Sequence, residues 1–205
     1  LVGSLFIAGV AFEEKDVYKL KQLGVKDSKL LSNSTRFRLC ANIKKIAKKT
    51  KVIKIEPYEI DDAVDRKWGL NLNWLEAHKT AQIINEINPD RAIIDCPSPN
   101  ISKYKSYLKN LLENKDVELV VEHKADLNHI ECSAASILAK CEREIEVEKI
   151  RKFIGIDIGS GYASDPKTVK FLEEHQEMYA DLFRKSWAPY KKQKEKKNQR
   201  ILEDF

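Results

Sequence analysis

Two aspartates follow apolar segments that predict buried strands. Asp95 ends the segment Arg91-Ala-Ile-Ile-Asp95, and Asp126 follows the segment 117–122 about thirty residues later. Acids at the ends of neighbouring strands can converge on one point in space. Hard cations such as Mg²⁺ prefer oxygen ligands and keep several waters. The two aspartates therefore predict a metal site of the kind that serves phosphoryl chemistry.

Each aspartate also has a simpler explanation. Asp95 can cap the proline-rich loop 96–100, because Asp side chains often hydrogen-bond to nearby backbone in turns. A loop aspartate such as Asp126 is commonplace. A two-metal site also needs several carboxylates to balance its charge, and none of the further candidates stands out: Glu122, Glu131 and Asp157. The occurrence of both aspartates after apolar strands favours the metal site.

A glycine-rich segment, Gly159-Ser-Gly-Tyr-Ala-Ser-Asp-Pro-Lys-Thr168, is the second candidate. Glycines allow a backbone to approach a ligand closely, and an exposed Tyr162 could stack on a sugar or a base. A plain loop is the alternative, closed by Asp165 as a helix cap with Pro166 at the first helical position, and with Tyr162 covering a core edge. The segment Asp27-Ser28-Lys29 could similarly hold a phosphate or form an ordinary turn.

Basic residues are clustered along the chain. It has 205 residues, with 37 Lys and Arg against 32 Asp and Glu, for a net charge of +5. Eight basic residues and no acidic one lie between Arg36 and Lys54, and eight lie between Arg184 and Arg200 with only Glu195 opposing them. Such clusters can follow a phosphate backbone. Solvated helix faces explain each cluster equally well.

The composition favours a cytoplasmic protein. No apolar run approaches the roughly 18 residues that a membrane helix needs, so we expect no membrane partner. The cysteines form no C-x-x-C pair and fit no zinc spacing, which indicates free thiols in a reducing compartment; they are Cys40, Cys96, Cys132 and Cys141. Hydrophobic residues make up 42%, enough for one ordinary domain with a small extension.

The elements that position these candidates follow from hydrophobic periodicity. Strands are expected at residues 5–12, 51–56, 91–95 and 117–122. Helices are expected at residues 13–23, 32–49, 60–66, 72–87, 101–114 and 129–153, and after Asp165 and Trp187. This order favours an α/β fold with a mixed sheet of about five strands and helices on both faces. We expect a catalytic domain over residues 1–153 and a helical substrate-binding extension over residues 154–205.

Five motifs, taken together and in order, resemble the type 2 ribonucleases H (ribonuclease HII). They are Lys26-Asp-Ser-Lys-Leu30, Leu72-Asn-Trp-Leu-Glu76, Ile94-Asp95, His123-Lys-Ala-Asp126 with Ser133-Ala-Ala-Ser-Ile-Leu-Ala-Lys140, and the segment Gly159–Thr168. The segment Arg184-Lys-Ser-Trp187 also resembles the start of the family's C-terminal helix. The resemblance covers essentially the whole chain.

The resemblance implies a ribonuclease H-like fold and endonucleolytic cleavage of the RNA strand of RNA·DNA hybrids. Cuts on the 5′ side of ribonucleotides embedded in duplex DNA are included, as in DNA replication and repair. It implies hydrolysis assisted by two Mg²⁺ or Mn²⁺ ions, one activating water and the other stabilising the leaving oxygen. Asp95 and Asp126 resemble the family's catalytic, metal-binding acids. We expect a monomer.

The resemblance also implies substrate contacts. Tyr162 resembles the residue that packs on the deoxyribose after the ribonucleotide and reads the RNA–DNA junction. The remaining residues resemble phosphate-binding or active-site neighbours: Ser28, Lys29, Gly161, Ser133, Ser136 and Lys140.

One family motif is absent from the sequence. The family opens with Asp-Glu-Ala and a Gly-Arg-Gly turn; the two acids complete the metal site, and the turn helps to recognise the 2′-hydroxyl. By alignment this segment would lie immediately before Leu1, and the sequence begins without Met. We expect the printed chain to be a fragment that is inactive alone, although its parent is an enzyme.

Two other functions compete with the ribonuclease. One is a non-catalytic nucleic-acid-binding module with an incomplete metal site. The other is a carboxylate-metal nuclease of the same fold that acts on DNA junctions. The Gly-Ser-Gly-Tyr162 loop disfavours the second, because an enzyme that cuts only DNA has no need to read a ribose junction.

Overall fold

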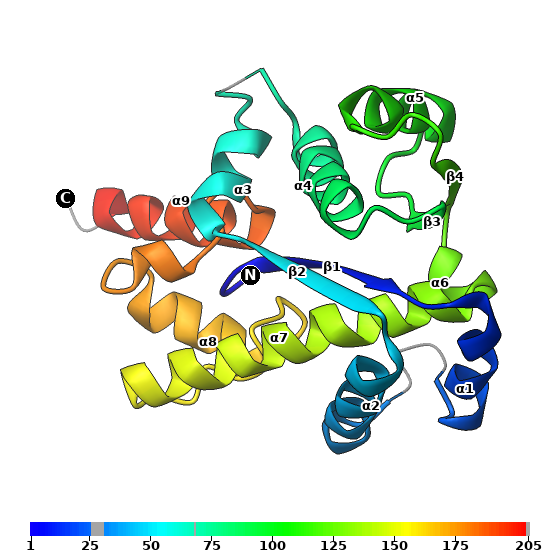
Figure 1. Ribbon diagram of the computed structural model, residues 1–205. Coiled ribbons are helices and arrows are strands. Elements are labelled where there is room, and N and C mark those ends of the chain that lie inside the picture. The colour runs from blue at the N-terminus through cyan, green and yellow to red at the C-terminus, as the bar shows by residue number, and fades with distance from the viewer. Residues whose placement is uncertain (26–30, 68, 204–205) are drawn as a thin grey trace. The chain divides into compact units, whose positions relative to one another are not determined.

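The computed structural model describes residues 1–25, 31–67 and 69–203 (Figure 1). The chain divides into two compact units. The first unit comprises Leu1–Leu5, Ile55–Leu72 and Arg143–Phe205, and the second comprises Phe6–Lys54 and Asn73–Glu142. We expected a catalytic domain over residues 1–153 and a substrate-binding extension over residues 154–205. That division concerns function rather than compactness, and it stays a prediction.

The described residues form an α/β fold with four named strands. β1 (Leu5–Ala11) pairs with β2 (Lys49–Ile55), and β3 (Arg91–Asp95) pairs in parallel with β4 (Glu118–Glu122). The expected single sheet of about five strands is not confirmed, since the described part of the chain has two two-stranded sheets. Apolar patterning marks a segment as a strand, but it does not say which strand it pairs with.

Helices surround these strands in the second unit (Figure 1). The bounds are η1 (Glu14–Asp16), α1 (Val17–Gln22), α2 (Asn33–Ile46), α4 (Leu72–Ile87), α5 (Ile101–Leu111), α6 (Ala125–Asn128) and the first half of α7 (Ile130–Ile154). Ser32 caps α2, because its side chain accepts a hydrogen bond from the Thr35 amide. One core joins α4 and α5 to β3 and β4, and another joins α1 and α2 to α7.

The first unit is mainly helical. It contains α3 (Pro57–Val64), the later part of α7, α8 (Pro166–His175), η3 (Ala180–Leu182) and α9 (Ala188–Glu203). Its core has Val2 and Phe183 in a β-bridge, packed with Phe171 and Leu172 of α8. Arg184 is buried and donates to the carbonyl oxygens of Gly3 (3.0 Å) and Ser4 (2.7 Å). Burial, followed by the nearby charge of Arg143, lowers the pKa of Arg184 to about 10.

Most expected element boundaries agree with the structure, and two differences have a local cause. α3 begins at Pro57 rather than at residue 60, because Pro57 suits the first helical position and Glu56 forms a capping box with Glu59. The helix expected over residues 129–153 begins at Ile130, because the short α6 precedes it and His129 has an extended backbone.

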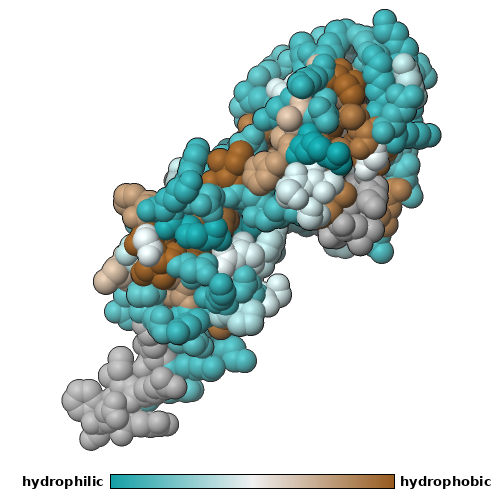
Figure 2. Space-filling model, turned by 90° about the horizontal axis from the view of Figure 1, so that it is seen from below, coloured by the Kyte–Doolittle hydropathy of each residue, from teal (hydrophilic) through white to brown (hydrophobic). Residues whose placement is uncertain are grey.

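The surface is mixed in character. The face in Figure 2 is largely hydrophilic and is interrupted by hydrophobic patches. The most exposed large apolar side chains are Phe153, Met178 and Tyr58. None of the described helices combines the length and the apolar character that crossing a membrane requires.

We expect Gly9→Ala to destabilise the second unit. Ile53 of β2 packs with Ile83 and Ile87 of α4, and β1 borders this cluster. A Cβ at Gly9 would overlap Ile83 Cγ2 and lie 3.2 Å from Ile87 Cδ1. Overpacking of this kind costs about 1–3 kcal/mol, measurable as a loss of unfolding free energy in urea. In an Ile83→Ala background the loss should shrink, and an equal loss in both backgrounds would contradict the steric cause.

Candidate active site

The two predicted acids lie at the end of β3 and in the short helix that follows β4. The parallel register pairs Asp95 with Glu122, so both strands end side by side (Figure 1). The chain then turns through Lys124, which has a left-handed backbone (φ 57°), and begins α6 at Ala125. The Ala125 amide donates to Asp95 Oδ1 at 3.3 Å. The Asp95 carboxylate therefore contacts the backbone directly beside Asp126.

The surroundings of the two acids differ. Asp95 is exposed, whereas Asp126 is only 8% exposed. The buried Ser133 hydroxyl donates to the Asp126 backbone carbonyl, which ties α6 to the first turn of α7. One acid can thus meet a ligand from solvent while the other is held inside the fold.

Cys132 is a further residue near the two acids, and sequence reasoning identified it only as an ordinary free thiol. Burial, and then the negative charges of Asp95 and Asp126, raise the pKa of the Cys132 thiol to about 12. Because charge interactions weaken with distance, this thiol must lie near both carboxylates. The only sequence signal that could have pointed to Cys132 as a site residue was its position next to Ser133, in the first turn of α7.

The donor set fits part of a site for a hard cation. Asp95 and Asp126 offer carboxylate oxygens, the ligands that Mg²⁺ and Mn²⁺ favour. Among the residues that the structure describes, no group of three or more His, Cys, Asp or Glu side chains could hold a metal ion. Two carboxylates alone therefore leave room for waters, substrate oxygens or further acids.

The further acids considered from sequence have other contacts. Glu122 Oε2 accepts a hydrogen bond from Asn128 Nδ2 at 3.2 Å and lies 3.3 Å from His129 Nε2. Asp157 belongs to the first unit and pairs with Lys167 at 2.6 Å. This pairing is the main cause of the lowered pKa of Asp157. Glu122 is therefore the strand partner of Asp95 with its carboxylate bonded to Asn128, whereas Asp157 is paired within the first unit.

Three predicted substrate contacts share one face of α7. Ser133, Ser136 and Lys140 are spaced by three and four residues, so they lie on the same side of the helix. Ser133 is buried, and Ser136 and Lys140 are half-buried. Their roles stay predictions. Ser28 and Lys29, also predicted from the resemblance, lie outside the described residues.

The glycine-rich loop is held by an internal hydrogen-bond network in the first unit. The buried Thr168 hydroxyl donates to the Ile158 carbonyl (2.8 Å) and accepts from the Gly161 amide (2.9 Å). Asp165 accepts from the amides of Ser160 (2.7 Å) and Lys167 (3.0 Å). These bonds, with Ser160 contributing most, lower the pKa of Asp165. The expected Asp165 cap and Pro166 helix start are confirmed.

Tyr162 projects from this ordered loop. Tyr162 is 44% exposed. One face of its ring lies over the Arg143 guanidinium, with 3.8 Å between Arg143 Cζ and the ring centroid. Neighbouring Gly161 has φ +77°, and a Cβ there would come within 2.8 Å of Arg143 Nη2. A glycine is required at this position for both reasons.

The two basic clusters differ in how much of their charge is neutralised. In the cluster between Arg36 and Lys54, three lysines form ion pairs within the second unit: Lys44 with Glu142, Lys48 with Glu13 and Lys51 with Glu86. In the other cluster, α9 presents four exposed lysines: Lys191, Lys192, Lys194 and Lys196. The α9 lysines are therefore the better candidate for phosphate contacts.

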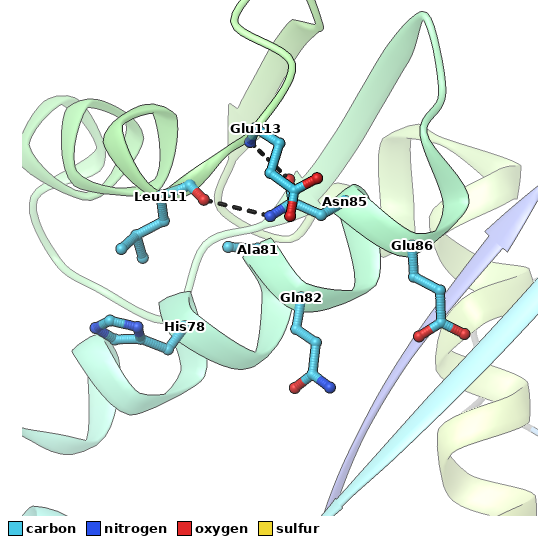
Figure 3. A pocket seen from close by; sticks show the side chains of 7 residues that line it. All are labelled: His78, Ala81, Gln82, Asn85, Glu86, Leu111 and Glu113. Carbon is cyan, nitrogen blue, oxygen red and sulfur yellow. Dashed lines mark hydrogen bonds between the residues drawn. The ribbon is translucent and has the colours of Figure 1, made fainter.

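A pocket of about 480 Å³ lies along α4 and the end of α5 (Figure 3). Several polar groups that line the pocket bond α4 to neighbouring segments of the second unit. Asn85 donates to the Leu111 carbonyl (3.3 Å) and accepts from the Glu113 amide (3.0 Å), while Glu86 pairs with Lys51. None of the predicted site residues lines this pocket. Its lining is explained by packing of the second unit.

Comparisons with known proteins agree across the chain. Residues 1–190 match the family model described as Ribonuclease HII. A ribonuclease HII from Methanothrix thermoacetophila is 36% identical over 191 residues, which is 92% of this chain and 89% of that protein. A ribonuclease HII from Pyrococcus furiosus is 37% identical over 213 residues, or 100% of this chain and 92% of that protein.

Solved structures give the same result. The ribonuclease H2 from Pyrococcus horikoshii OT3 superposes with a TM-score of 0.83 at 34% identity, covering 95% of this chain and 92% of that one. The structure of a PCNA:RNase HII complex from Archaeoglobus fulgidus has a TM-score of 0.75 at 37% identity, covering 85% and 80%. These neighbours confirm the expected ribonuclease H-like α/β fold.

We expect Thr168→Val to destabilise the glycine-rich loop, because it leaves the Gly161 amide and the Ile158 carbonyl without their buried partner. An unsatisfied buried polar group costs about 1–3 kcal/mol. Thermal or urea unfolding measures the loss. Thr168→Ser keeps the hydroxyl and serves as the matched control. Equal losses in both variants would show that the Thr168 methyl group, rather than its hydroxyl, stabilises the loop.

Proposed function

Because this chain belongs to the ribonuclease HII family, we propose that the protein hydrolyses the RNA strand of RNA·DNA hybrids and cuts 5′ of ribonucleotides embedded in duplex DNA. The single observation that supports this best is the hydrogen bond from the Ala125 amide to Asp95 Oδ1, which puts the carboxylate at the end of β3 next to the backbone that leads into Asp126. These two acids are the ones that the sequence motifs relate to the family's acids.

Asp95 and Asp126 would hold Mg²⁺ or Mn²⁺ through their carboxylate oxygens. When bound, two such ions supply Lewis-acid activation of water and stabilise charge on the leaving oxygen. The Ala125 amide orients one Asp95 oxygen, and the Ser133 hydroxyl fixes the backbone that carries Asp126. Preorganisation of this kind spares the ligands an ordering cost when the ions bind.

Tyr162 and α9 would bind the substrate. The exposed ring of Tyr162 packs on the deoxyribose that follows the ribonucleotide, while the 2′-hydroxyl distinguishes RNA from DNA. The exposed lysines of α9 contact phosphates, which gives affinity without sequence preference. Ser136 and Lys140 lie one and two turns after Ser133 on the same face of α7, and in this proposal they contact a phosphate.

A non-catalytic nucleic-acid-binding module is the second candidate. It is favoured by the exposed lysines of α9, which can contact phosphates without any metal-binding acid. This candidate binds hybrids through the same basic residues and cleaves none of them. A cleavage assay therefore separates the two functions.

We expect Asp95→Asn to abolish cleavage of a DNA duplex that carries one ribonucleotide. The assay uses the protein as its gene encodes it, with Mg²⁺ or Mn²⁺. Losing a metal-binding carboxylate removes several kcal/mol of transition-state stabilisation, so the rate should fall by about a hundredfold or more. Asp95 is exposed, which makes a folding defect a poor explanation for the loss.

Asp116→Asn, at another exposed aspartate of the same unit, is the matched control and should cut 5′ of the ribonucleotide at the normal rate. An intact, folded wild-type protein that cuts neither this duplex nor a long hybrid would leave the binding module as the better description.

We expect hybrid binding to weaken steeply between about 50 and 200 mM salt, because each neutralised phosphate contributes about −0.9 to the slope of log K against log salt. Replacing Lys191, Lys192, Lys194 and Lys196 with Gln should flatten that slope, measured by fluorescence anisotropy without divalent metal. The comparison variant replaces Lys44, Lys48 and Lys51, which are already ion-paired, and should change the slope less. The reverse ranking would reject α9 as the phosphate contact.

A further inference from the structure

We propose that Arg143 is a positioning residue for Tyr162, holding one face of the ring so that the opposite face is presented to the nucleic acid. This inference rests on the proposed function of Tyr162 and adds the group that orders it. Arg143 and Tyr162 both belong to the first unit.

The difference in burial indicates that Arg143 supports Tyr162, rather than the reverse. Arg143 is 8% exposed, whereas Tyr162 is 44% exposed. The guanidinium carbon lies 3.8 Å from the ring centroid, well within the range of a cation–π contact. The buried cation therefore lies beneath the ring, and the exposed surface of Tyr162 is directed to solvent.

Arg143 also anchors the backbone of the loop. Its two terminal nitrogens, Nη1 and Nη2, both lie 3.1 Å from the Ser160 carbonyl oxygen, two residues before Tyr162. The absence of a side chain at Gly161 leaves the space that Nη2 approaches. One planar guanidinium thus fixes the ring and the chain that leads to it, a combination that a lysine ammonium cannot reproduce in full.

Anchoring of the loop explains the hydrogen bonds of Arg143, but it does not by itself require a buried positive charge. A buried charge is costly unless well paired, and the Glu144 carboxylate lies as far as 4.0 Å from Arg143 Nη1. Arg143 also repels the buried Arg184, whose pKa is lowered first by burial and then by the charge of Arg143. An apolar side chain would fill the space without this repulsion. The cation is better explained by its contact with Tyr162.

Arg151 offers a matched control within the same helix. Its Nη2 donates to the Gly159 carbonyl at 2.9 Å, so it also anchors the glycine-rich loop. Arg151 forms ion pairs with Glu148 and Asp157, whereas the guanidinium that lies over the Tyr162 ring is that of Arg143. Replacing Arg151 therefore tests loop anchoring without the ring contact.

The experiment measures single-turnover cleavage by the protein as its gene encodes it. The substrates are a duplex with one ribonucleotide and an all-RNA strand hybridised to DNA. Arg143→Gln should slow the first reaction roughly three- to thirtyfold, the range of a guanidinium–ring contact, and slow the second less. Arg143→Lys should recover part of the loss, since it keeps a cation near the ring. Arg151→Gln should leave the ratio of the two rates unchanged.

Two further measurements separate positioning from simple destabilisation. The double variant Arg143→Gln/Tyr162→Ala should be no slower than Tyr162→Ala alone, because both changes remove one coupled unit. In protein labelled with 3-fluorotyrosine, the Tyr162 fluorine resonance, assigned with Tyr162→Phe, should move toward its unfolded position in Arg143→Gln. Melting temperatures identify any variant that has lost its fold.

Additive losses in the double variant, an unmoved fluorine resonance, or an equal change in selectivity for Arg151→Gln would each overturn the proposal. If the wild-type protein cleaved neither substrate, the proposed function would fail, while the fluorine resonance would still report whether Arg143 orders the ring.

Discussion

The parallel pairing of β3 with β4 determines where the acids of this protein lie. Residues in a strand alternate between faces, so a slip of one residue would move Asp95 away from its present neighbours. The register is held by the core beneath it, where Ile94, Leu119 and Val121 are buried against α5. The packing of ordinary apolar side chains thus sets the position of the carboxylate at the strand end.

The turn after β4 completes this arrangement at a local cost. Lys124 adopts a left-handed backbone that is unfavourable for a side chain with a Cβ. The Ala125–Asp95 hydrogen bond and the Ser133–Asp126 hydrogen bond offset part of that cost. Strain of this kind persists where the surrounding structure holds it, and it often occurs at functional sites. Burial, and then the charges of Asp95 and Asp126, raise the pKa of the Cys132 thiol beside this turn.

Local features of this fold could be predicted from sequence, and features that depend on distant residues could not. The bounds of β3 and α4, the Ser32 cap and the Asp165-Pro166 helix start follow from short-range rules. The pairing of Lys44 with Glu142 spans 98 residues, so the neutralisation of the first basic cluster was not visible in the sequence. Cys132 and Arg143 were missed for the same reason, because their partners are defined by the fold.

The acidic and the basic residues of this protein have separate roles in the proposed function. The carboxylates of Asp95 and Asp126 repel a phosphodiester, so a phosphate can approach them only when cations are bound. The lysines of α9 and the guanidinium beneath Tyr162 attract the same backbone without any cation. In the proposed function, holding the nucleic acid and cleaving it therefore depend on separate groups. A change that weakens binding at α9 leaves the electrostatics of the carboxylate pair intact, which is why the second basic cluster and the acids can be tested independently.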